Sequence, residues 1–167
     1  MLLGLFVIFL LWFTYERIKA DHQSSYSNEG FWEKERRASF TPTVKIDNLP
    51  YITLDESVIP TPCDEDSEEL RNVLNEIRSL KDSKMIDLSD LTNTDLKLKY
   101  GTPNFTVLAK ADADFALLVS DCEKAGELLS EAGRSDEAYA ITDYAARISG
   151  YVRLRSKADE LLISRQN

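Results

Sequence analysis

The sequence predicts an all-α protein built around a hairpin of two antiparallel helices. Apolar residues recur every seven positions between residues 102 and 132, and a second set follows three residues after each of them. The first set is Leu108, Phe115, Cys122 and Leu129, and the second is Ala111, Leu118, Ala125 and Ala132. This spacing places both sets on one face of a long helix. Gly133 and a second amphipathic segment from about Asp136 then predict a tight turn into a second helix.

Composition limits the classes of partner and chemistry. The chain has 167 residues, enough for one modest domain with an appendage, and a formal net charge of −9. An acidic chain lacks the basic stripe that phosphate contacts need, so no nucleic-acid partner is expected. Two cysteines imply no disulfide framework. Cys122 lies on the apolar stripe, which favours a small hydrophobic role over a redox role.

The N-terminal residues predict a membrane anchor. Met1–Tyr15 is apolar apart from Thr14, and contact with the lipid bilayer is expected through this run. Fifteen helical residues span only about 22 Å of a hydrocarbon core of about 30 Å, so the span is marginal. No Lys or Arg precedes the run and no small-residue cleavage pattern follows it. These features favour a single-pass transmembrane helix within residues 1–20 over the alternative, a cleaved signal peptide.

Residues 21–62 are expected to form a juxtamembrane linker and an extended arm. Basic residues follow the apolar run, at Arg17, Lys19, Lys34, Arg36 and Arg37, which predicts a cytoplasmic C-terminal domain. Residues 31–37 mix aromatic and basic side chains, and they either lie on an anionic leaflet or only fix the topology. Four of the five prolines fall between residues 41 and 62, where they favour extended backbone.

Residues 63–167 are expected to form the helical domain. Its first helix is predicted to begin at Thr61 or Asp64, with an acidic first turn that is solvated rather than calcium-binding, because the spacing of a calcium loop is absent. Its apolar face is Leu70, Val73, Leu74, Ile77 and Leu80. Residues 88–100 fit a helix or a strand. We favour a short helix, because Thr92 and Asp95 form a capping pair.

Three further helices complete the domain. The long helix is expected to start with Thr102 as its cap and Pro103 at the first position, and the next helix runs from about Ser135 to Ser149. The last is predicted from Tyr151 to about Arg165. Its expected inner residues are Val152, Leu154, Ala158, Leu161 and Leu162, and its expected outer residues are Arg153, Arg155, Lys157 and Glu160.

The segment from about residue 119 to residue 152 resembles a tetratricopeptide repeat. The matching positions are Gly126, Leu129, Gly133, Ala138 and Ala145, whose small residues let two helices approach closely. Cys122 in place of the family's tryptophan and Gly150 in place of its closing proline are departures. One repeat cannot bury its own faces, so the neighbouring helices must complete a short tetratricopeptide-like stack or an irregular bundle.

The resemblance implies a partner groove on the first helix of the repeat. The corresponding residues are Ser120, Glu123, Glu127, Ser130 and Glu131. Their acidic character fits a basic segment of an unknown protein partner. The alternative is a plain solvated helix face.

The motifs of catalysis are missing from the sequence. The single histidine, His22, lies in the linker, and no metal-binding, nucleophile or phosphate-loop motif occurs. We therefore expect no enzyme activity, cofactor, metal or small-molecule substrate. The first hypothesis is a membrane-tethered cytoplasmic adaptor for protein–protein interaction. The alternatives are a structural subunit of an obligate membrane-associated complex or homo-oligomer, and an extracytoplasmic binding module that follows a signal peptide.

Overall fold

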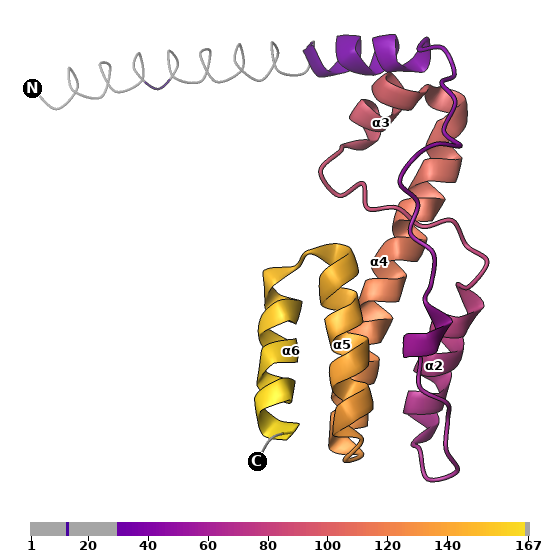
Figure 1. Cartoon of the computed structure of the whole chain (residues 1–167). Helices are drawn as coiled ribbons and strands as arrows, with labels where there is room; N and C mark the ends of the chain where they lie inside the picture. The colour runs from indigo at the N-terminus through magenta and orange to yellow at the C-terminus, as the bar shows by residue number, and fades with distance from the viewer. Residues whose placement is uncertain (1–12, 14–29, 166–167) are drawn as a thin grey trace, which may run out of the picture. The chain divides into compact units, whose positions relative to one another are not determined.

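The computed structural model describes Phe13 and residues 30–165. Its elements are the 3-10 helix η1 (Glu56–Val58) and the α-helices α2 (Glu68–Ser79), α3 (Asn93–Tyr100), α4 (Thr102–Glu131), α5 (Ser135–Ser149) and α6 (Val152–Arg165) (Figure 1). Residues 30–39 are helical as well. In the described ranges no strand forms, and the one β contact is an isolated antiparallel bridge between Ile52 and Met85. The prediction of an all-α fold is confirmed.

The chain divides into two compact units. The first comprises Met1–Val44 and Leu91–Phe105, and the second comprises Lys45–Asp90 and Thr106–Asn167. Helix α4 contributes its first turn to the first unit and its remaining turns to the second. The boundaries expected from composition do not coincide with this division, because residues 30–44 bond to α3 and its flanks rather than forming a free connector.

In the first unit, α3 is bonded to the helical segment 30–39. Lys34 forms an ion pair with Asp95 at 2.7 Å, and Glu35 accepts a hydrogen bond from Thr94 at 2.8 Å and a second from Lys97. The favoured helix within residues 88–100 is confirmed, with a capping box of Thr92 and Asp95. It starts at Asn93 rather than near residue 88. These polar contacts fix one face of segment 30–39 against α3.

The turn after α3 needs a glycine. Gly101 has a φ of 86°, and a Cβ atom there would lie 2.6 Å from the carbonyl oxygen of Pro42. Thr102 was expected to cap α4, but it is the first residue of that helix, and its hydroxyl donates to the Ala38 carbonyl at 3.0 Å. The residues around Gly101 therefore join α3, the start of α4 and the chain near residue 42.

In the second unit, α2 begins later than predicted. The expected start at Thr61 or Asp64 is wrong, because α2 begins at Glu68 with Ser67 as its cap. The Asp66 carboxylate accepts the Cys63 N–H at 2.7 Å, which folds the preceding residues into a turn. The predicted apolar face of α2 is buried as expected. Before η1 the chain is extended, and it buries Leu54 in the core of this unit.

Helices α4 and α5 form the predicted hairpin, and α5 has the predicted bounds. The apolar stripe of α4 is buried as expected, with the exception of Ala132, which is exposed beyond the end of the helix. Gly133 forms the turn with a φ of 76°. Cys122 is fully buried, and burial raises the pKa of its thiol to about 12, in agreement with the small hydrophobic role.

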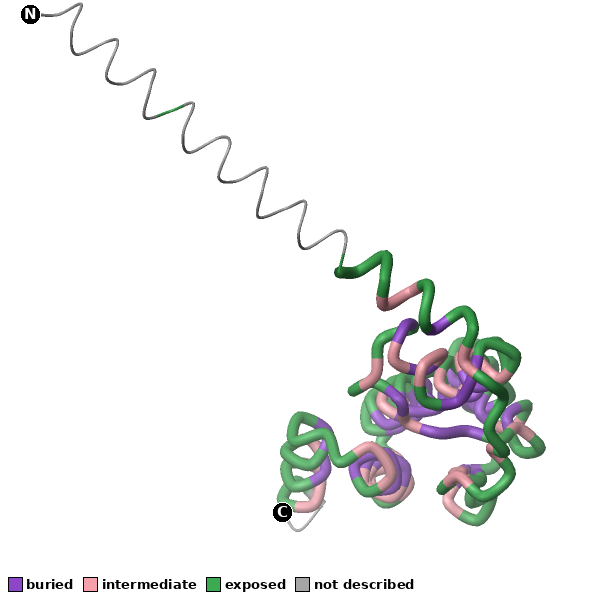
Figure 2. Tube along the Cα trace, turned by 90° about the horizontal axis from the view of Figure 1, so that it is seen from above, coloured by how far each residue is buried: buried purple, intermediate pink, exposed green. Residues whose placement is uncertain are grey.

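Helix α6 lies beside α5 (Figures 1 and 2). Leu154 and Ala158 are buried one turn apart and define its inner face. Val152 was expected on that face, but its side chain is 79% exposed. Two residues rotate a helix by about 200°, which carries Val152 to the side opposite Leu154. Lys157 was expected to point outward, but it turns toward α4.

Among the helices that the structure describes, none has both the length and the apolar character needed to cross a bilayer. The predicted transmembrane anchor within residues 1–20 lies outside the described residues, apart from Phe13.

The packing of Gly126 generates a testable prediction. A Cβ atom at Gly126 would lie 2.2 Å from Thr142 Oγ1, so we expect Gly126→Ala to lower the free energy of unfolding by about 1–3 kcal/mol. Thr142→Ala removes the hydroxyl. In that background, Gly126→Ala should raise the free energy of unfolding by up to about 1 kcal/mol, because alanine has the higher helix propensity. Urea denaturation of the four proteins measures the coupling. Additivity within about 0.5 kcal/mol would show that the two helices do not depend on this contact.

Candidate functional site

An open groove of about 410 Å³ lies between α4, α5 and α6 in the second unit. Its wall on α4 carries Glu123, Gly126, Glu127, Ser130 and Glu131. These positions recur at intervals of three and four residues, so they share one side of the helix. The volume is within the range of about 300–1,000 Å³ that is typical of ligand pockets.

Four of the five groove residues predicted from the sequence line this groove. The exception is Ser120, which is exposed on α4 but is not part of the lining. The sequence did not predict the contribution of α6, which supplies Lys157, Glu160, Leu161 and Ser164. A signal for it was present, because Lys157 and Glu160 are one helical turn apart and share a side of α6.

The groove is also lined by members of an ion-pair cluster. Lys157 Nζ lies 2.6 Å from Glu123 Oε1 and also pairs with Glu127, while Arg153 bonds to Glu123 from the exposed side. Burial raises the pKa of Glu123, but hydrogen bonds from Arg153 and Lys157 outweigh it and bring the pKa below its ordinary value. Glu123 is therefore ionised at neutral pH. Part of the acidic surface is neutralised within the chain.

One end of the groove keeps uncompensated negative charge. Glu131 and Glu160 both line it and are exposed. Neither carboxylate forms an ion pair with any residue that the structure describes. Leu161 of α6, which follows Glu160 in the chain, adds an apolar contact to the lining. This end can accept a positively charged group beside an apolar contact.

The floor of the groove is the close approach of α4 and α5. Gly126 faces Thr142, and the carbonyl of Ala138 lies 3.5 Å from the position of a Cβ atom at Gly126. Both Thr142 and Ala138 are buried. Beside the Thr142 hydroxyl, any larger residue than glycine would fill the floor or separate the helices.

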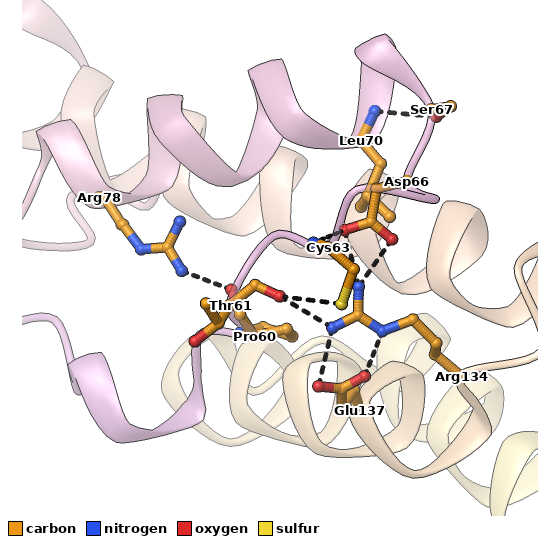
Figure 3. A network of polar contacts seen from close by, with 9 residues as sticks. All are labelled: Pro60, Thr61, Cys63, Asp66, Ser67, Leu70, Arg78, Arg134 and Glu137. Atoms are coloured by element: carbon orange, nitrogen blue, oxygen red, sulfur yellow. Dashed lines mark hydrogen bonds and ion pairs between the residues drawn. The ribbon is translucent and has the colours of Figure 1, made fainter.

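A second polar cluster fixes the turn between α4 and α5 (Figure 3). Arg134 Nη1 lies 2.8 Å from both carboxylate oxygens of Asp66, and Arg134 Nη2 donates to the Thr61 carbonyl at 3.1 Å and to Glu137 at 2.8 Å. Arg78 donates to the Pro60 carbonyl on the same loop. The cluster ties the loop before α2 to the start of α5. The acidic first turn that we expected from the sequence to be solvated includes Asp66, and for this residue the expectation is wrong, since its side chain is only 3% exposed.

The charge state of Asp66 follows from its hydrogen bonds. The Cys63 N–H lowers its pKa most, burial raises it, and the Arg134 guanidinium lowers it further, so that the pKa is below its ordinary value. The Asp66 carboxylate accepts three hydrogen bonds from two donor groups, the Cys63 N–H and Arg134 Nη1, and it is hardly solvated, so it depends on both groups. We interpret the cluster as structural, because the charged groups of Asp66, Arg134 and Glu137 pair with one another within the chain.

Asp121 on α4 is a third polar group of note. It is 7% exposed, and its Oδ2 atom has no hydrogen-bond partner among the described residues. Burial and the neighbouring Glu76 of α2 raise its pKa, while Lys124 opposes this shift. The side chain therefore weakens the contact between α2 and α4 when it is ionised.

No protein-family model, curated protein or solved structure matches this chain. The interpretation of the groove therefore rests on its own geometry and charge. The likeness to a tetratricopeptide repeat stays a prediction from the residues around Gly126.

The first prediction from this site concerns Arg134. Arg134→Ala leaves the buried Asp66 carboxylate without its guanidinium, and we expect it to lower the free energy of unfolding by about 3 kcal/mol or more at pH 7. Because the folded state lowers the pKa of Asp66, the stabilisation exists above the ordinary value of 3.8 and is lost as the pH falls through the folded value. Urea denaturation of both proteins between neutral and acidic pH measures this.

Arg71→Ala is the matched control for Arg134→Ala. Arg71 is an exposed arginine near Asp66, and its removal should change stability by no more than about 0.5 kcal/mol. Equal effects of the two substitutions would contradict the role of Arg134.

The second prediction concerns Asp121. Asp121→Asn keeps the shape and removes the buried charge, so we expect the free energy of unfolding to rise by about 1 kcal/mol at pH 7. The folded protein holds this proton to a higher pH than the unfolded chain, so the wild type loses stability as the pH rises above 3.8. The gain should therefore shrink in acid. Urea denaturation against pH tests this, with the exposed Asp90→Asn as control, and a loss of stability at neutral pH would contradict it.

Proposed function

We propose that this protein is a membrane-tethered adaptor that binds a basic segment of another protein in the groove between α4, α5 and α6. The observation that carries the proposal is the pair of exposed carboxylates, Glu131 and Glu160, that line the groove and form no ion pair with the described residues. The groove residues are held by two packed helices and a docked third. A preformed groove favours binding because little ordering is needed.

The chemistry of the groove supports a basic peptide with an apolar neighbour. Four glutamates and one lysine line it, so its potential is negative overall. Leu161 and the Gly126 floor offer contact for an aliphatic stem or a small apolar side chain. A lysine or arginine of the partner would meet Glu131 and Glu160 while its stem covers Leu161. The role is one of binding, without catalysis.

We further infer that α4 and α5 form a tetratricopeptide-like unit, with α6 in the place of the next first helix. Gly126, Ala138 and Ala145 support this, because they are buried at the small positions of such a unit. In that arrangement the binding surface faces the first helices. The groove is lined mainly by α4 and α6, which would be the first helices of two successive units in this proposal.

The tether and the cytoplasmic location are inferences from the sequence. The apolar run Met1–Tyr15 supports the tether, and the basic residues after it support a cytoplasmic C-terminal domain. A tethered adaptor would hold its partner near the bilayer.

One observation favours the second candidate, a structural subunit of a larger complex. Val152 and Ile163 are 79% and 62% exposed on the outer side of α6. In a stack of helical hairpins this side is covered by the next unit. A second copy or another subunit would cover it in an obligate assembly.

Peptide selection tests the proposed groove. We expect the full-length chain, selected against a random peptide library, to enrich peptides with a lysine or arginine next to an apolar residue. The double variant Glu131→Lys/Glu160→Lys should bind these peptides about tenfold or more weakly, because attraction becomes repulsion. Fluorescence anisotropy with the enriched peptides gives the dissociation constants.

Glu56→Lys/Glu65→Lys is the matched control, because it makes the same change of charge at exposed positions outside the groove. It should bind like the wild type. Enrichment of acidic or purely apolar peptides would contradict the proposal, and so would an equal loss of peptide affinity in the two double variants.

A further inference from the structure

We propose that the outer side of the helical segment 30–39, continued by Phe40, lies on an anionic lipid surface. The contact is made by an aromatic–basic stripe, which we define as Trp32, Arg36 and Phe40. The inference rests on the proposed tether, since the tether brings this segment to a bilayer.

The inner side of the segment is already occupied. Lys34 pairs with Asp95 at 2.7 Å, and Glu35 bonds to Thr94 and Lys97 of α3. Ala38 follows Lys34 and Glu35 by about one helical turn, so it shares their side of the segment, and it is fully buried. This side therefore has no free charge to offer to a partner.

The outer side carries the stripe. Trp32, Arg36 and Phe40 are four residues apart and therefore lie along one side of the segment. Trp32 is 65% exposed and Phe40 is 82% exposed, and the segment is mostly exposed in Figure 2. Phe31 packs edge-on against Trp32, with 5.6 Å between the ring centroids. Tryptophan partitions to the headgroup region of a bilayer, and phenylalanine occurs with it on the lipid-facing side of interfacial helices.

The charge on this side is positive. Arg36 approaches Glu33 only at 4.0 Å, with both side chains largely exposed, and Arg37 forms no ion pair with the described residues. This side therefore carries the two guanidinium groups of Arg36 and Arg37 and the one carboxylate of Glu33, although the net charge of the whole chain is −9. An anionic leaflet attracts guanidinium groups within a Debye length, while most of the acidic chain is repelled. This contrast limits lipid contact to the stripe.

The connection to the apolar run is short enough for the contact. Fourteen residues separate Tyr15 from Gly30, and a chain of that length spans at most about 50 Å. A protein partner for the stripe would need pockets that match the positions of the Trp32 and Phe40 rings. A lipid surface has no such requirement. The position of the stripe next to the membrane-directed run favours the lipid surface.

Tryptophan fluorescence of the full chain tests the contact. The chain has two tryptophans, so Trp12→Phe leaves Trp32 as the only emitter. In phosphatidylcholine vesicles that contain phosphatidylserine, we expect the Trp32 emission to shift to the blue and to be quenched by brominated acyl chains. In vesicles of phosphatidylcholine alone, the emission should resemble that of an indole in water.

Charge variants in the same background decide the outcome. Arg36→Gln/Arg37→Gln should weaken the surface contact about fivefold for each arginine removed. Lys45→Gln/Lys81→Gln removes the same charge at exposed positions elsewhere and should leave the shift unchanged. An unshifted emission in both vesicles, an equal shift in both, or no effect of the arginine variant would each overturn the inference.

Vesicle flotation separates this inference from the tether. A chain that floats with vesicles of both compositions while Trp32 stays in water contradicts the surface contact alone. A chain that floats with neither contradicts the tether and the surface contact together.

Discussion

The close approach of α4 and α5 at Gly126 is the constraint on which the second unit depends. With a hydrogen atom in place of a side chain, Gly126 lets Thr142 and the Ala138 backbone come against α4. The buried Ala125, Ala138 and Ala145 extend this contact along both helices. Small residues give little hydrophobic stabilisation by themselves. Their effect is to bring the larger side chains of α4, such as Phe115 and Leu129, within packing distance of the neighbouring elements.

Two further contacts build on this hairpin. Helix α6 docks through Leu154 and Ala158 and places Lys157 opposite Glu123. At the other end, Arg134 follows the turn residue Gly133 and reaches the loop before α2. Apolar packing and ion pairs thus position the α6 wall of the groove, and the pairing of Arg134 with the buried Asp66 carboxylate holds the turn that follows α4. Both contacts need α4 and α5 at their observed separation.

The sequence predicted the helices well where a periodic signal was strong. The stripe of α4, the bounds of α5 and the capping box of α3 follow from local rules that act within one or two turns. The start of α2 was missed because Asp66 reads locally as a helix-terminal acid, while its partner Arg134 is 68 residues away in the chain. The side of α6 that meets α4 was missed for the same reason. A lysine at Lys157 is ordinary on an exposed face, and only the tertiary position of Glu123 and Glu127 turns it inward.

The docking of Lys157 also has a consequence for the ligand proposed for the groove. Because Lys157 belongs to the same chain as Glu123 and Glu127, it competes for them at an effective concentration that does not depend on the amounts of other molecules present. Free lysine, arginine or small polyamines at lower concentration do not displace such an internal competitor. A ligand of the proposed groove would gain a net advantage by engaging the exposed carboxylates and Leu161 at the same time. Lys157 would thus favour extended ligands that make several contacts over simple counterions, which make only one.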